Sequence, residues 1–192
     1  MLTAEIHQAF VKAVEDREAL EDVTTIARGR SGGGSNQPAP ALFATKGRGF
    51  LADTTLQEEV FGAASLVVEC SDFDELCAVA EHLEGQLTAT LHMDEPDKAL
   101  ARRLLPILER KVGRILVNDF PTGVQVSHAM VHGGPFPATS DGRSTSVGTL
   151  AIRRFLRPVC YQNVPPDLLP DALDDSNSLG LWRRVNGDLG RW

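Results

Sequence analysis

Hydrophobic residues recur at four-residue intervals near the start of the chain. Ile6, Phe10 and Val14 have this spacing, and charged residues lie on the opposite face. The pattern predicts an amphipathic helix from residue 3 to about residue 22. Residues 29–40, GRSGGGSNQPAP, then predict a flexible surface loop. A phosphate-binding loop would need a preceding strand and a GK[ST] ending; the pattern predicts no strand before this run, and the run lacks that ending.

Strand-like and helix-like patterns alternate in the middle of the chain. Short apolar runs predict strands at 41–45, 65–70, 86–93 and 114–118. A helix is predicted at 71–85, with Ser71 and Asp74 as a capping box and Gly85 at its end. A second helix is predicted to start at Asp94 and to bend at Pro106. Such alternation predicts a three-layer α/β fold with a mostly parallel sheet and flanking helices.

The last third of the chain has a weaker pattern. Residues 119–142 are rich in Gly and Pro and lack periodicity, which is typical of a functional or disordered loop. A helix is predicted at 145–156 and a lone strand at 157–164, followed by a tail rich in Pro and Asp. Because a lone strand must pair with another segment or be covered, this strand indicates a contact elsewhere.

Composition and charge narrow the classes of function. The 192 residues are 42% hydrophobic and carry a net charge of −7, which disfavours binding to nucleic acid or to anionic membranes. The start of the chain lacks the pattern of a signal peptide, and no apolar run is long enough to span a bilayer. The odd set of three cysteines predicts reduced thiols and a cytoplasmic protein.

The polar residues do not make a complete active site. Cys70, Cys77 and Cys160 are interpreted as packing residues, with a nucleophile as the less favoured alternative. His128 and His132 have the spacing of a metal pair, but no third ligand lies nearby in the sequence. No catalytic residue and no metal site is therefore assigned. A cationic group is interpreted as a solvated helix end, or alternatively as an attractor of anionic ligands; its members are Arg143, Arg153, Arg154 and Arg157.

Several separated motifs, taken in order, resemble a known family. LQEEVFGAASLVVEC, EGQLTATLH and the long block that starts at GRILVNDFPTGVQVSHAMVHGG resemble the C-terminal half of NAD(P)-dependent aldehyde dehydrogenases. The last block is most similar to the branch that oxidises 2-oxoglutarate semialdehyde to 2-oxoglutarate. The resemblance covers about residues 41 to 185 and implies NAD or NADP as the cofactor and an aldehyde as the substrate.

The resemblance also implies roles for individual residues. Glu59 would hold the hydroxyl groups of the nicotinamide ribose, and Phe61 would pack near the nicotinamide. Phe120, Pro121, Thr122 and Gly123 would line the aldehyde entrance. The segment 157–164 would join the sheet of a neighbouring subunit, which implies a homo-oligomer. One departure lies in the first motif, where the family has Pro and this chain has Ala63.

In the family, the nucleophilic cysteine, the glutamate base and the dinucleotide-binding domain precede the EEVFG motif and would fall before Met1. The resemblance therefore implies a chain that is inactive alone and works with a complementing N-terminal portion. Two alternatives remain: a non-catalytic assembly module, and a small hydrolase that uses Cys160 with His128 or His132. The expected organisation is a helical region at 1–28, a linker at 29–40, a partial catalytic domain at 41–156 and an oligomerisation strand and tail at 157–192.

Overall fold

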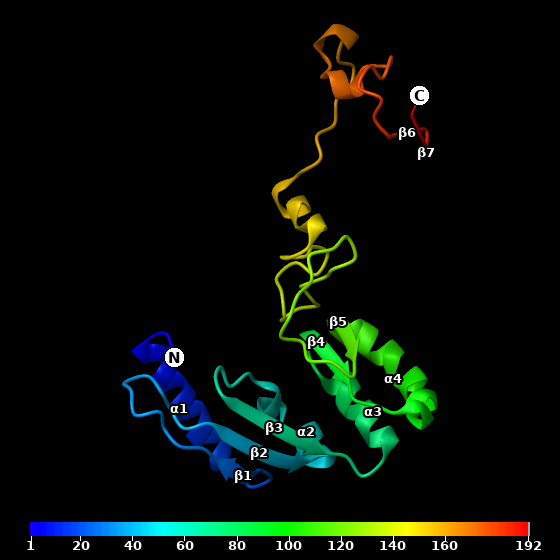
Figure 1. Ribbon diagram of the computed structural model, residues 1–192. Coiled ribbons are helices and arrows are strands. Elements are labelled where there is room, and N and C mark those ends of the chain that lie inside the picture. Colours follow the sequence, from blue (N-terminus) through cyan, green and yellow to red (C-terminus); the bar gives the residue numbers. More distant parts are fainter. Residues whose placement is uncertain (192) are drawn as a thin grey trace. The chain divides into compact units, whose positions relative to one another are not determined.

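The computed structural model describes residues 1–191, which form two compact units (Figure 1). The first unit is Met1–Arg154 and the second begins at Phe155. All three clusters of buried hydrophobic side chains belong to the first unit. Among the described residues, no helix is both long and apolar enough to cross a membrane.

Helix α1, Ala4–Glu18, begins at the N-cap residue Thr3, whose side chain accepts a hydrogen bond from the Ile6 N–H. The helix ends before residue 22, and strand β1, Thr24–Arg28, follows it. The prediction of a helical region as far as residue 28 is therefore wrong. All five residues of β1 are exposed, so the strand has no alternating pattern and exists because it pairs with β2.

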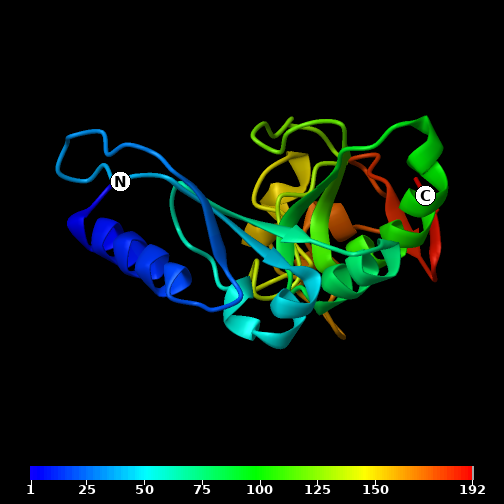
Figure 2. The same cartoon turned by 90° about the horizontal axis from the view of Figure 1, so that it is seen from below.

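The first sheet has the strand order β1-β2-β3. Strands β2, Ala41–Lys46, and β3, Ala64–Glu69, are parallel, whereas β1 and β2 are antiparallel. Helix α2, Gly47–Ala52, and the 3₁₀ helix η1, Thr54–Gln57, connect β2 to β3. Phe43 of β2 packs against Phe10 and Val14 of α1. This contact places α1 along the sheet, as Figure 2 shows.

The second sheet consists of the parallel strands β4, Gln86–Leu91, and β5, Val112–Val117. Helix α3, Phe73–His82, precedes β4; the 3₁₀ helix η2, Glu95–Asp97, and helix α4, Lys98–Lys111, precede β5. The N-cap of α3 is Asp72 rather than the predicted Ser71, because the Asp72 carboxylate accepts the Glu75 N–H. Helix α4 continues through Pro106. Parallel strand pairs joined through helices confirm the predicted α/β class.

An irregular stretch follows β5 and runs back past the start of the second sheet. The Gly85 N–H donates to the Phe136 carbonyl, and a Cβ at Gly113 would lie 2.1 Å from the Gly133 oxygen. These positions need glycine because the main chain passes so close. The predicted helix at 145–156 is a 3₁₀ helix, η3, Thr149–Phe155. The Thr145 hydroxyl, four residues before this helix, donates to the Val147 carbonyl and accepts the His132 N–H.

The second unit contains short elements only. They are the 3₁₀ helices η4, Pro166–Leu168, and η5, Asp171–Leu173, and the antiparallel strands β6, Arg183–Val185, and β7, Asp188–Gly190. The predicted strand at 157–164 is not formed within the described part of this single chain. Because a strand is defined by its hydrogen-bonded neighbour, an extended segment without one is not a strand.

Candidate functional site

The EEVFG motif forms an exposed turn between η1 and β3. Glu59 is exposed and the Phe61 ring is 65% exposed, whereas Leu56, just before the turn, is 5% exposed. Val60 packs against the cluster of Phe10 and Phe43. The turn is thus anchored by Leu56 just before it and by Val60 within it, and it exposes one carboxylate and one aromatic ring. Both side chains line a cavity of about 460 Å³.

Arg17 of α1 lines the same cavity from beneath the turn. Its side chain is 7% exposed, and its Nη2 donates to the Glu58 carbonyl oxygen at 3.1 Å. The charge of Arg17 also contributes to a lowered pKa of Asp53, after the stronger hydrogen bonds from Thr55. The sequence analysis missed Arg17. Its spacing from Phe10 and Val14 was the available signal, because this spacing places an arginine on the buried face of α1.

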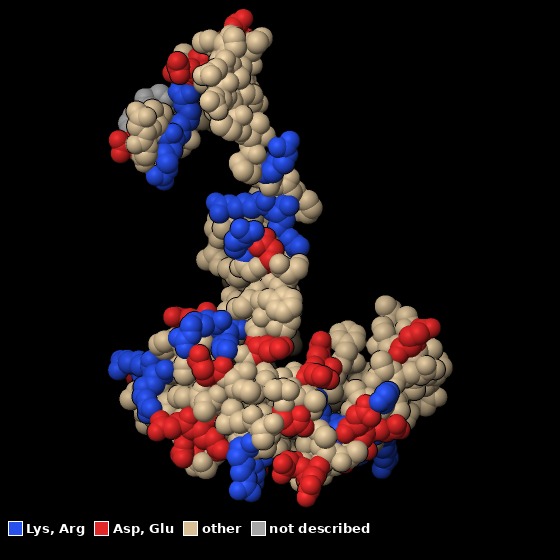
Figure 3. Space-filling view, turned by 180° about the vertical axis from the view of Figure 1, so that it is seen from behind, with Lys and Arg blue, Asp and Glu red and all other residues tan. Residues whose placement is uncertain are grey.

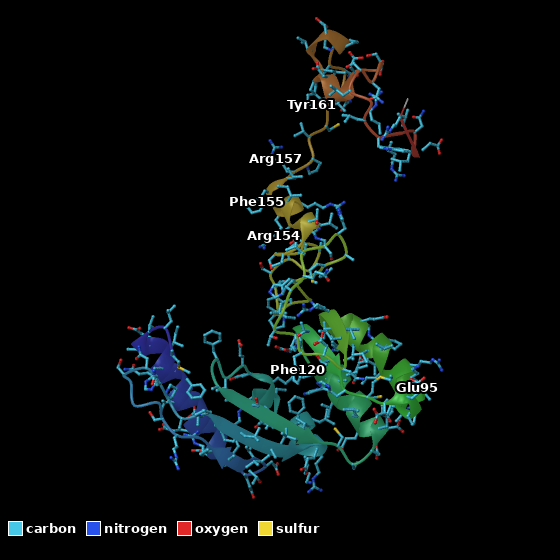
Figure 4. All side chains as sticks on the ribbon, in the orientation of Figure 1. Glu95, Phe120, Arg154, Phe155, Arg157 and Tyr161 are labelled. Atoms are coloured by element: carbon cyan, nitrogen blue, oxygen red, sulfur yellow. The ribbon has the colours of Figure 1, made fainter. Side chains whose placement is uncertain are left out.

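The loop after β5 is tied to the end of β4. The Asn118 side chain, on a residue with φ of 53°, accepts the Met93 N–H and donates to the Met93 carbonyl, each at 2.8 Å. The Phe120 ring lies 5.4 Å from the His92 ring, centroid to centroid, and is 71% exposed (Figure 4). The contacts between the residues that follow β4 and β5 therefore fix the position of the start of the loop.

Arg114 of β5 holds the apex of this loop. Its Nη2 donates to the Pro121 carbonyl and its Nη1 to the Gly123 carbonyl, each at 2.8 Å. Pro121, Thr122 and Gly123 are exposed. A Cβ at Gly123 would meet no atom within 4 Å, so the space beside the apex is open. The four residues at 120–123 thus lie together in an ordered surface loop, and none of them lines the cavity beside Glu59.

The cysteines and histidines do not converge on a reactive centre in the part of the chain that the structure describes. Burial raises the pKa of the Cys70 thiol, and the charges of Glu75 and Asp72 raise it further. Cys77 packs against the cluster of α3 and α4, and Cys160 is exposed in the second unit. No group of three or more His, Cys, Asp or Glu residues within 1–191 could hold a metal ion.

Charged side chains are unevenly distributed along the chain. Four arginines and no acidic residue occur between Asp141 and Asp167, although the whole chain has a net charge of −7. They are Arg143, Arg153, Arg154 and Arg157. Figure 3 shows basic groups close together near the end of the first unit, whereas acidic and basic groups are mixed over the sheets and helices.

Comparison with known proteins identifies close relatives of the sequence. No family model matches the chain. The chain is 54% identical over 187 residues to alpha-ketoglutaric semialdehyde dehydrogenase 2 of Azospirillum brasilense. The alignment covers 97% of this chain and 36% of that protein. It is 54% identical over 165 residues to alpha-ketoglutaric semialdehyde dehydrogenase of Acinetobacter baylyi, covering 85% of this chain and 31% of that protein. The chain thus spans about a third of the length of these relatives.

Solved structures show the same fold. The delta-pyrroline-5-carboxylate dehydrogenase of Mycobacterium tuberculosis has a TM-score of 0.64 at 18% identity, covering 88% of this chain and 32% of that one. A betaine aldehyde dehydrogenase of Staphylococcus aureus has a TM-score of 0.62 at 17% identity, covering 86% and 33%. With the sequence identities above, these matches confirm the resemblance: the chain is homologous to a portion of the alpha-ketoglutaric semialdehyde dehydrogenases and has part of the aldehyde dehydrogenase fold.

Proposed function

We propose that this chain supplies the cofactor-contacting turn and the substrate-facing loop of an aldehyde dehydrogenase. The reaction would be oxidation of alpha-ketoglutaric semialdehyde, or a similar aldehyde, to the acid with NAD+ or NADP+. The observation that carries the proposal is 54% identity over 187 residues to proteins named for this activity. The Staphylococcus aureus structure of the same fold is a complex with NAD+, which supports the choice of cofactor.

The exposed turn suits a nicotinamide riboside. A carboxylate at Glu59 accepts hydrogen bonds from two ribose hydroxyls, and an aromatic ring at Phe61 gives the nicotinamide a flat surface. Both groups are exposed and line one cavity, so a ligand reaches them without rearrangement of the turn. Phe120, Pro121, Thr122 and Gly123 would form one wall of the aldehyde site.

We assign the chemical steps to the portion of the relatives that this chain does not span. Thiolate attack on the aldehyde and hydrolysis of the thioester need a nucleophilic cysteine and a base. A raised thiol pKa makes Cys70 a poor nucleophile, and among the described residues the thiols of Cys77 and Cys160 have no hydrogen bond to a base. In this organisation, residues 41–156 belong to a catalytic domain and residues 157–192 to an oligomerisation tail.

A chimera tests this function directly. In it, the chain replaces the aligned portion of the Azospirillum brasilense relative, and aldehyde-dependent reduction of NAD+ and NADP+ is followed spectrophotometrically. We expect turnover by the chimera, and by the chain mixed with the separately made remainder of the relative, but none by the chain alone. Turnover by the chain alone, or an inactive chimera that folds normally, would contradict the proposal.

A role in assembly is the second candidate, either within a homo-oligomer or on longer relatives. Residues 157–164 are largely exposed, and within the described chain they have no strand partner. Figure 4 labels Arg157 and Tyr161 on this extended segment. Size-exclusion chromatography with the Azospirillum brasilense relative should show co-elution, and a chain that stays monomeric alone and in the mixture would exclude this role.

The free state of all three cysteines favours a cytoplasmic location.

A further inference from the structure

Helix α1 contacts the EEVFG turn at two points on one face. Phe10 and Arg17 are seven residues apart, so both side chains lie on the same side of the helix. A Cβ at Gly62 would lie 2.4 Å from the Phe10 ring, so only glycine allows this close approach. At the start of the turn, Nη2 of Arg17 donates to the Glu58 carbonyl oxygen at 3.1 Å. The helix therefore holds both ends of the turn that carries Glu59.

The bond from Arg17 orients the peptide group that leads into Glu59. The Glu58 carbonyl and the Glu59 N–H belong to one planar trans peptide unit. Holding the carbonyl oxygen therefore fixes the plane from which the Glu59 side chain departs. Arg17 forms no salt bridge to any described carboxylate, and the Glu59 side chain is exposed. Arg17 thus acts on the main chain of the turn and leaves the Glu59 carboxylate available to a ligand.

The other terminal nitrogen of the Arg17 guanidinium is buried without a partner. Arg17 is 7% exposed, and its Nη1 has no hydrogen-bond partner within the described part of the chain. An unpaired buried donor lowers stability, and an apolar side chain of similar length would avoid this cost. Stability alone therefore does not account for an arginine at this position.

The charge of Arg17 lies among carboxylates beside the turn. Arg17, Glu58, Glu59 and Val60 all line two cavities, of about 460 and 320 Å³. Asp16 lines the smaller one, and Arg17 is the basic residue in both linings. Neighbouring carboxylates repel the phosphate groups of a nucleotide, and a guanidinium between them offsets part of that repulsion. This gives the buried charge a use that an apolar residue would not have.

We propose that Arg17 is a positioning residue for the cofactor and acts through Glu59. Nη2 holds the peptide between Glu58 and Glu59 so that the Glu59 carboxylate meets the ribose hydroxyls, and the guanidinium charge offsets the nearby carboxylates. This inference rests on the proposed function for the identity of the ligand, a nicotinamide nucleotide. Loss of Arg17 then weakens binding of the cofactor and spares binding of the aldehyde.

The first test uses the chain itself and needs no activity. Nicotinamide mononucleotide is titrated into the isotope-labelled chain, and the amide signals of Glu59 and Phe61 are followed by NMR. We expect both signals to shift with saturation. Arg17→Met keeps the length of the side chain but has no charge or donor, so it should weaken binding about ten-fold. It should also lower the order parameter of the Glu59 amide. Arg17→Lys keeps a charge and a donor and should recover part of both losses.

A matched control and a stability measurement separate positioning from a purely structural role. Lys12→Met removes a cation from the same helix, but the Lys12 side chain is 74% exposed, so this variant should bind the nucleotide as wild type does. Arg17→Met removes the unpaired Nη1 together with the bond to Glu58, so its urea midpoint should change less than that of Arg17→Ala.

Three results of the titration would overturn the inference. The first is an absence of any shift at Glu59 and Phe61 in wild type. The second is an Arg17→Met variant that matches wild type in both nucleotide affinity and Glu59 order. The third is an equal loss of affinity in Lys12→Met and Arg17→Met.

The second test uses the active chimera and measures KM for both substrates. Arg17→Met should raise KM for NAD+ about ten-fold, with KM for the semialdehyde much less affected, and Arg17→Lys should lie between this variant and wild type. Unchanged KM for NAD+, or equal rises for both substrates, would refute the positioning role and leave the proposed function standing. A chimera that reduces no cofactor would refute the proposed function, and the nucleotide titration then decides the role of Arg17 alone.

Discussion

At the scale of single residues, the exposed turn depends on Arg17, which is buried beside Phe10 and Val14 on one face of α1. Replacing Arg17 with Ala leaves the Glu58 carbonyl without its side-chain donor. We expect the free energy of unfolding to fall by about 1–3 kcal/mol, the usual cost of an unmade buried hydrogen bond. Urea denaturation followed by circular dichroism measures this. Arg30→Ala is the control on an exposed arginine, and equal losses in both variants would contradict the assignment.

Glu59 and Glu58 allow a matched comparison of neighbouring carboxylates. In the chimera, Glu59→Gln keeps an acceptor but removes the charge that strengthens hydrogen bonds from the ribose hydroxyls. We expect KM for NAD+ to rise about ten-fold, with a smaller effect on kcat. Glu58→Gln should have little effect, because Glu58 contributes its main-chain carbonyl to the contact with Arg17. Equal effects of the two substitutions would argue against Glu59 as the ribose ligand.

At the scale of elements, the start of α3 depends on pH through Asp72. The hydrogen bond from the Glu75 N–H is the main cause of its lowered pKa, which lies below the ordinary value of 3.8. A lowered pKa in the folded state means that ionised Asp72 stabilises the fold above the ordinary value. This stabilisation is lost as the pH falls through the lowered pKa.

The Asp72→Asn variant tests this pH dependence. Asparagine is also a good N-cap but lacks the negative charge that favours a helix N-terminus. We therefore expect a lower midpoint of thermal unfolding than wild type at pH 7, and a difference that shrinks as the pH falls from 3.8 through the lowered pKa of Asp72. Asp188→Asn, on an exposed residue of β7, serves as the control. A difference that stays constant with pH would contradict the linkage.

The main helices and strands of the first unit could be predicted from local pattern. The predicted strand at 86–93 is β4, and the helix with Leu104 and Leu108 is α4. Strand β1 could not be predicted, because all of its residues are exposed and only the ladder with β2 makes it a strand. The opposite error occurred at 157–164, where a strand-like sequence has no partner within the described chain.

At the scale of the whole molecule, the two units differ in their hydrophobic cores. The three buried clusters draw on residues before Asn118, whereas the second unit exposes large apolar side chains. Examples are Leu168, Leu189 and Trp182, which are 68%, 60% and 62% exposed. A unit of this size with little buried apolar surface is only marginally stable.

This difference predicts separate unfolding transitions. Both tryptophans, Trp182 and Trp192, occur near the end of the chain, so their fluorescence reports on that region. Far-UV circular dichroism reports mainly on the helices of the first unit. We expect the fluorescence transition at a lower urea concentration than the circular dichroism transition. A chain that ends at Arg154 should keep the circular dichroism midpoint, and coincident transitions in the full chain would contradict the division.

The candidate site was also only partly accessible from sequence. The EEVFG turn and the loop at 120–123 are contiguous motifs, so a resemblance could point to them directly. Arg17 lies 41 positions along the chain from Glu58, whose carbonyl oxygen it binds. Arg114 lies 7 and 9 positions from Pro121 and Gly123, whose carbonyl oxygens it binds. Their roles depend on where a guanidinium ends in space, which one-dimensional spacing does not specify.

The sequence by itself determined the α/β class, the main elements of the first unit and the homology, because periodicity and ordered motifs are local properties of the chain. Only the tertiary structure decided that β1 is a strand, that 157–164 has no strand partner within the described residues, and that Arg114 holds the carbonyl groups of Pro121 and Gly123. These features depend on hydrogen bonds between groups that folding brings together, and such bonds leave little trace in local pattern.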